Sequence, residues 1–150
     1  MDVYSVYDFT NKVQQERSLI SKEINTMKKD IQNRSDIEVI VKEFYGIVRN
    51  DKTIGHFFNQ VMQVNWDVHL PIMTDFWENL LFFDNDYEGN PMSIHKTIDK
   101  KHPMKLKDFN RWTKLFNETV DRNFEGPNAE TIKQKAGRIA TIMQQSLGRK

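Results

Sequence analysis

The chain has 150 residues, with 22 basic and 21 acidic side chains and no cysteine. That length can bury a core without disulfides or zinc, and the absence of cysteine excludes thiol catalysis, thiolate-bound zinc and cysteine-ligated iron–sulfur clusters. The balanced charge argues against a nucleic-acid partner. A mean hydropathy of −0.69 and the lack of an apolar run of about 18–20 residues argue against a membrane span. No signal peptide is visible, so we expect a cytoplasmic protein.

Residues 1–26 are predicted to be an extension, helical from about residue 18, ahead of a domain over 27–150. Ile20, Ile24, Met27 and Ile31 follow one another at intervals of four, three and four residues. This spacing is typical of a helix with a narrow apolar stripe. Three interpretations of the extension stay open: a helix packed on the domain, a dimer contact, or a disordered segment.

Two long helices are predicted between residues 35 and 83. Ser35 followed by Glu38 matches a capping box, and helical spacing then continues to about residue 50. A second stripe runs from about residue 65 to 83, and Pro71 within it either kinks the helix or marks its first turn. The apolar stripes consist of Ile37, Ile40, Val41, Phe44 and Val48, then Trp66, Leu70, Met73, Trp77, Leu80 and Leu81.

The second half of the chain predicts three further helices. Asn90-Pro91 pairs an N-cap residue with a proline at the first helical position, which favours a short helix carrying His95. A long helix follows over 109–124, and Asn128 can cap the last one. No segment alternates like a strand for more than a few residues, so we predict an all-α fold. The apolar faces of the last two helices are Phe109, Trp112, Phe116, Val120 and Phe124, then Ala129, Ile132, Ala136, Ile139, Ala140, Met143 and Leu147.

Aromatic side chains are abundant, with ten Phe, four Tyr and three Trp, while motifs of hydrolases and nucleotide-binding proteins are absent. No pair among the four histidines has the spacing of a helical metal clamp. A lone His on an apolar face is more often a core residue, but His69 and His95, on two helices, can together hold a flat, iron-bearing cofactor. Its other face needs a dry pocket with donors, such as Tyr45, Trp112 and His69. The rings that can line it are Phe44, Phe57, Phe58, Phe76, Trp77 and Phe116.

Several short stretches follow one another in a recognisable order: Phe44-Tyr45, residues 54–59, 66–70 and 76–77, residues 87–92 leading to His95, and residues 109–112 with Leu115-Phe116. From about residue 27 to 147 these ordered motifs resemble the group III truncated hemoglobins. The resemblance implies a shortened globin fold that clamps heme b between the helix of His69 and the helix of His95, with an extra N-terminal helix. It implies His95 as the proximal iron ligand, and Tyr45, His69 and Trp112 as residues that stabilise a ligand on the distal face.

Other residues fall around the implied heme. Phe58 matches the family's aromatic at the turn between helices, and Met73 the apolar residue one turn after the distal histidine. Lys96 and His102 either reach a heme propionate or stay in solvent, and His56 has no assigned role. The complete set of predicted heme contacts is His95, Phe57, Phe58, Met73, Phe76, Trp77, Met92, Ile98, Phe116 and Met143.

The resemblance implies that dioxygen, carbon monoxide, nitric oxide or peroxide binds at the heme. Hydrogen bonds from Tyr45 and Trp112, worth roughly 1.5–3 kcal/mol each when charge-assisted, slow the release of a ligand. Slow release favours redox chemistry over oxygen transport: nitric oxide dioxygenation or a peroxidase-like reaction, with a separate reductase. The alternative from another class is a cofactor-free interaction or sensor module, in which Tyr45, His69, His95 and Trp112 are core residues.

Overall fold

The structure, a computed structural model, describes residues 3–61, 65–83 and 104–146. Every regular element in these ranges is helical, which confirms the all-α prediction. The helix predicted to carry His95 lies outside the described residues, and so does Leu147. No helix in the described ranges is long and apolar enough to cross a membrane. The elements in chain order are α1 (Val3–Thr26), α2 (Arg34–Arg49), the short π-helix η1 (Phe57–Val61), α3 (Trp66–Phe82), α5 (Leu106–Asn123) and α6 (Pro127–Ser146).

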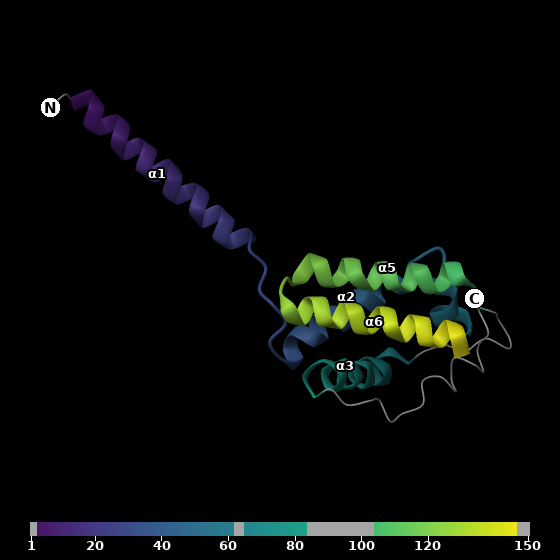
Figure 1. Cartoon of the computed structure of the whole chain (residues 1–150). Coiled ribbons are helices and arrows are strands. Elements are labelled where there is room, and N and C mark those ends of the chain that lie inside the picture. The colour runs from purple at the N-terminus through teal and green to yellow at the C-terminus, as the bar shows by residue number, and fades with distance from the viewer. Residues whose placement is uncertain (1–2, 62–64, 84–103, 147–150) are drawn as a thin grey trace.

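Helices α2, α3, α5 and α6 form a bundle around one core (Figure 1). Helix α5 packs along α6, α2 packs against both α3 and α5, and α3 also contacts α6. The core is built mainly from the apolar faces predicted from helical spacing, although the α3 stripe apart from Trp77 is only partly buried. Its fully buried members include Ile37, Ile40, Phe44 and Val48 of α2, Phe109, Phe116 and Val120 of α5, and Ala129, Ile132, Ala136 and Ala140 of α6.

The start of α2 differs from the prediction. Asn33 is the N-cap in an extended conformation, and its side-chain oxygen accepts the backbone N–H of Asp36 at 3.2 Å. The capping box of Ser35 and Glu38 is therefore wrong: asparagine caps as well as serine does, and it comes two residues earlier. Helix α3 begins at Trp66, so Pro71 lies inside this helix and not in its first turn.

The N-terminus of α6 is capped by a residue far away in the sequence. The carboxylate of Asp30, in the linker after α1, accepts the backbone N–H groups of Asn128 and Ala129, each at 2.9 Å. The prediction that Asn128 caps α6 is therefore wrong, because Asn128 lies within the helix. Gly126 makes the approach possible. Its φ of +147° suits glycine, and a Cβ there would lie 2.5 Å from the carboxyl carbon of Asp30.

We expect Asp30→Ala to lower the free energy of unfolding by about 0.5–2 kcal/mol, the usual cost of losing a helix cap. Urea denaturation followed by circular dichroism measures the change. Asp8→Ala is the matched control, because it removes an exposed carboxylate from α1 without touching the bundle. An unchanged midpoint for Asp30→Ala would show that the linker does not hold α6.

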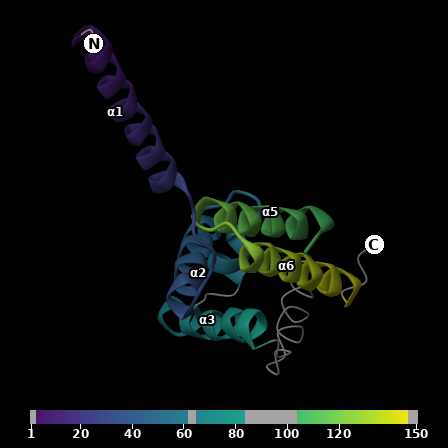
Figure 2. The ribbon, with the colours of Figure 1, turned by 60° about the vertical axis from the view of Figure 1, so that its left-hand side comes forward.

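Helix α1 stands apart from the bundle. Figures 1 and 2 show it projecting away as a single rod, joined to α2 by a short linker. The helix begins well before residue 18, and it ends before Met27 and Ile31, which the sequence placed on its stripe. Ile31 is instead fully buried in the core, whereas Ile20 on the helix is exposed. The structure therefore does not support an extension packed on the domain.

One ion pair ties α5 to the turn after α2. Nε and Nη2 of Arg111 donate to Oδ1 of Asp51 at 2.9 and 2.7 Å, and Oδ2 of Asp51 accepts the backbone N–H groups of Thr53 and Ile54. Burial acts to raise the pKa of the Asp51 carboxyl, but the hydrogen bonds from Arg111 and the backbone outweigh it. The pKa of Asp51 therefore lies below its usual value of 3.8.

This lowered pKa predicts a pH dependence of stability. The Asp51 carboxylate stabilises the fold above its unfolded pKa, and the contribution is lost as the pH falls through the lower folded pKa. We expect Arg111→Gln to flatten the fall in unfolding free energy between about pH 5 and pH 2, as measured by denaturant titration at each pH. Arg138→Gln, at an exposed arginine, should keep the wild-type profile. Superimposable profiles for the two variants would contradict the assignment.

Candidate functional site

Four aromatic rings meet where α2, η1 and α3 converge. Tyr45 is only 5% exposed. The centre of its ring lies 5.5 Å from the ring centre of His69 and 5.2 Å from that of Trp66. Phe58 of η1 lies 5.9 Å from Tyr45. Trp66 and His69 are three residues apart on one side of α3, and their rings lie 5.7 Å from each other. These four residues, which we call the Tyr45 cluster, bring together three predicted site residues.

The burial of Tyr45 decides its protonation. Removal from water raises the pKa of its phenol well above the usual value of 10.0, because the charged phenolate loses its hydration. The side chain therefore keeps its O–H at neutral pH. A neutral phenol in dry surroundings is a hydrogen-bond donor suited to a ligand that draws negative charge.

Trp112, the third predicted donor, belongs to a neighbouring group of rings. Its indole stacks on Phe116 at 5.7 Å and on Trp77 at 6.5 Å, and it meets Phe44 edge-on at 5.6 Å. Phe44 also contacts Tyr45 at 5.2 Å. The ring of Phe44 thus joins the Tyr45 cluster to the indole on α5.

The predicted heme contacts fall into three groups. Phe58 and Met73 are half-buried and pack against the core. His95 and its predicted neighbours lie outside the described residues, so the role of His95 as the proximal iron ligand stays a prediction. The predicted contacts that are fully or nearly buried are Phe57, Phe76, Trp77, Phe116 and Met143. Those outside the described residues are Met92, His95 and Ile98, together with Lys96 and His102.

Two residues of this region were missed by the sequence analysis as site residues. Trp66 contacts both Tyr45 and His69, and the guanidinium carbon of Arg49 lies 4.7 Å from the centre of its ring. This distance is that of a cation–π contact. The available signal was spacing, because Trp66 precedes His69 by three residues and Arg49 follows Tyr45 by four, so each pair shares a helix face.

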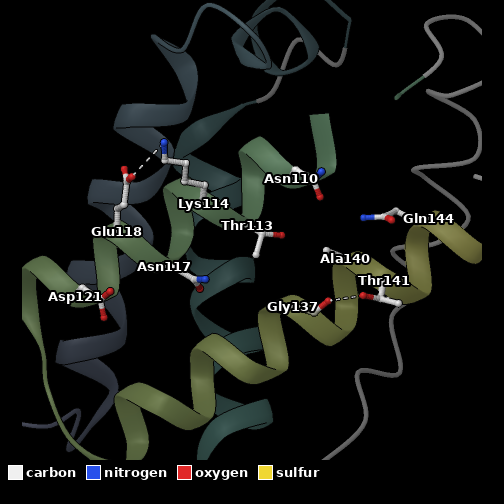
Figure 3. Close-up of a pocket in the computed structure, with 10 residues that line it drawn as sticks. All are labelled: Asn110, Thr113, Lys114, Asn117, Glu118, Asp121, Gly137, Ala140, Thr141 and Gln144. Atoms are coloured by element: carbon white, nitrogen blue, oxygen red, sulfur yellow. Dashed lines mark hydrogen bonds and ion pairs between the residues drawn. The ribbon is translucent and has the colours of Figure 1, made fainter. Parts of the chain in front are cut away.

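A groove of about 530 Å³ lies between α5 and α6 (Figure 3). Among the described residues, Oδ1 of Asn117 is buried there without a hydrogen-bond partner. The lining contains no member of the Tyr45 cluster and none of the predicted site residues. It consists of Asn110, Thr113, Lys114, Asn117, Glu118 and Asp121 of α5 and Gly137, Ala140, Thr141 and Gln144 of α6.

The aromatic region fits the cofactor implied by the resemblance. Heme is flat and largely apolar, and it needs imidazole on one side and a controlled set of donors on the other. Tyr45, His69 and Trp112 are donors of this kind. Half-buried apolar side chains beside them offer the surface that such a group covers: Phe58, Trp66, Leu70, Met73 and Leu80.

Comparison with known proteins agrees with this geometry. No family model matches the chain. A group 3 truncated hemoglobin of Campylobacter jejuni subsp. jejuni is 30% identical over 124 residues, which cover 81% of this chain and 95% of that protein. The crystal structure of a group III truncated hemoglobin from Campylobacter jejuni superposes with a TM-score of 0.69 at 30% identity, over 81% of this chain and 95% of that one. Sequence and shape thus agree over nearly the full length of these relatives.

Proposed function

Since the chain belongs to the group III truncated hemoglobins, globins that bind heme and small gas ligands, we propose that it holds heme b and retains its ligand for redox chemistry. The observation that carries this proposal is the buried, protonated Tyr45 beside His69. Hydrogen-bond donors at this position slow the release of a bound ligand, whereas an oxygen carrier has to release its ligand. Detoxification of nitric oxide or peroxide fits retention better than oxygen transport does.

The residues of the chain divide the work. By the family resemblance, His95 would hold the heme iron through one ring nitrogen, and a hydrogen bond from its other nitrogen would fix the tautomer. Bound heme supplies an iron that takes diatomic ligands and exchanges electrons. The Tyr45 hydroxyl and Trp112 Nε1–H would donate hydrogen bonds to a ligand of that iron. His69 joins this network or swings outward as a gate, and Phe58 and Met73 exclude water.

Nitric oxide dioxygenation also requires a partner. The net reaction combines nitric oxide, dioxygen and one electron to give nitrate, so each turnover consumes an electron. The sequence has no P-loop and no G-x-G-x-x-G motif for a nucleotide reductant. We therefore assign the electron supply to a separate reductase in the cytoplasm.

Product analysis tests the detoxification chemistry. Reduced protein equilibrated with dioxygen is expected to convert added nitric oxide to an equimolar amount of nitrate, as measured by ion chromatography. Tyr45→Phe is expected to lower the nitrate yield, because it removes only the hydroxyl that holds the ligand. Nitrite as the main product, with no difference between the two proteins, would contradict the proposal.

A second copy of the chain is the further partner that we propose, because helix α1 exposes apolar side chains. Isolated helices are marginal in water, and most of their stability comes from packing of an apolar face. Groups of exposed apolar side chains mark interaction surfaces. The large apolar side chains exposed on α1 are Val6, Tyr7, Phe9, Leu19 and Ile20.

A further inference from the structure

We infer that two copies of α1 pair in antiparallel directions through one apolar stripe, an arrangement that rests on the proposed self-association. Val6, Phe9, Val13 and Ile20 are spaced three, four and seven residues apart on this helix. They occupy four of the seam positions of a heptad repeat, and Glu16 and Glu23 occupy the other two on this helix. Phe9 is 69% exposed and Ile20 54% exposed, so the stripe is open to a partner.

A second copy of the chain is the occupant that fits this stripe. The chain's own bundle does not cover it, because both views show α1 projecting away (Figures 1 and 2). Helices that lie on membranes carry Lys and Arg on their polar face, whereas the charges of α1 balance. A second copy brings the same stripe, which a two-fold axis makes self-complementary. The charged residues of α1 are Asp8, Glu16 and Glu23 against Lys12, Arg17 and Lys22.

Glu16 decides the direction of the pair. It occupies the seam position between Val13 and Ile20. A parallel pair sets Glu16 against its own copy, which places two like charges in the seam. In an antiparallel pair Phe9 lies opposite the partner's Ile20, and Glu16 lies opposite the partner's Val13 with Lys12 of that copy beside it. Opposite charges then meet across the seam.

The antiparallel direction also separates the two bundles. A helix of 24 residues is about 36 Å long, and each bundle follows the C-terminal end of its own α1. The two heme domains therefore lie at opposite ends of the helix pair. Their ligand sites stay clear of each other.

Sedimentation equilibrium of the full chain tests the pairing. The wild type is expected at about twice the chain mass of 17.9 kDa. Ile20→Asp is expected to raise the dissociation constant at least about tenfold, equivalent to about 1.4 kcal/mol, whereas Gln15→Asp on the opposite face of α1 leaves it unchanged. A monomeric wild type at about 100 μM, or one that binds anionic vesicles without dimerising, overturns the inference. Heme content per chain, read from the same samples, reports separately on the proposed ligand chemistry.

Cysteine cross-linking tests the direction, because the native chain has no cysteine. Phe9→Cys and Ile20→Cys proteins, one of them labelled with nitrogen-15, are expected to form a mixed disulfide dimer when combined and oxidised. Neither protein alone should cross-link. In the antiparallel pair the two copies of residue 9 lie eleven residues apart along the helix, about 16 Å, beyond the Cα separation of about 7 Å that a disulfide spans. A disulfide formed by Phe9→Cys alone shows a parallel pair and overturns the inference.

Discussion

Replacing His95 with alanine is expected to abolish stable heme binding, the largest effect of any single substitution in this chain. The family resemblance implies that this imidazole would hold the iron, and without cysteine the chain has no thiolate to replace it. Heme content per chain, measured by absorption after reconstitution, should fall from near one to near zero.

His69→Ala is the matched control for that experiment. It removes the same side chain from the opposite side of the proposed heme, next to Tyr45. The His69→Ala protein is expected to keep a full complement of heme. If His69→Ala loses heme while His95→Ala retains it, the proximal and distal faces are reversed.

The second large effect is expected for dioxygen release. Tyr45→Phe removes the hydrogen bond proposed between its hydroxyl and the ligand, worth roughly 1.5–3 kcal/mol, so the dissociation rate should rise by roughly ten- to 150-fold at about 1.4 kcal/mol per decade. Phenylalanine keeps the ring that contacts Phe58 and Trp66, so the bundle stays intact. Trp112→Phe should also speed release. Stopped-flow mixing of the dioxygen complex with carbon monoxide measures these rates.

Tyr7→Phe provides the control for the loss of a phenol. Tyr7 is exposed on α1, away from the bundle, so dissociation should stay at the wild-type rate. Fast release from the wild type, unchanged in the Tyr45 and Trp112 variants, would remove the basis for ligand retention.

The helical faces were predictable, whereas the positions of the helix ends were only partly so. Phe109, Phe116 and Val120 are buried as their spacing requires, since periodicity alone determines which side of a helix is apolar. The cap of α6 was not predictable, because Asp30 reaches Asn128 and Ala129 from nearly one hundred residues earlier. Local sequence carries no signal for such a contact.

The position of α1 away from the bundle was likewise not predictable from the sequence. The spacing of Ile20 and its neighbours predicts an apolar stripe but does not say what covers it. Ile31 continues the same spacing, yet it is buried in the bundle while Ile20 is exposed, because the helix ends between them at Thr26. A stripe that crosses a helix end therefore belongs to two different environments.

At the candidate site, the sequence predicted which residues are hydrogen-bond donors better than it predicted which side chains contact them. Tyr45 and His69 were selected as donors, and their rings lie 5.5 Å apart. Trp66 contacts Arg49 and both of these rings. It was not selected, because an aromatic residue at helical spacing is ordinarily a core residue. Its contacts depend on how α2 crosses α3, which sequence periodicity does not specify.

The central claim is that this protein binds heme, and its absorption spectrum tests that claim most directly. The purified protein, reconstituted with heme and reduced, is expected to show an intense Soret band that shifts when carbon monoxide is added. A colourless protein after reconstitution would contradict the claim and would favour a cofactor-free helical module in which Tyr45, His69 and Trp112 are core residues.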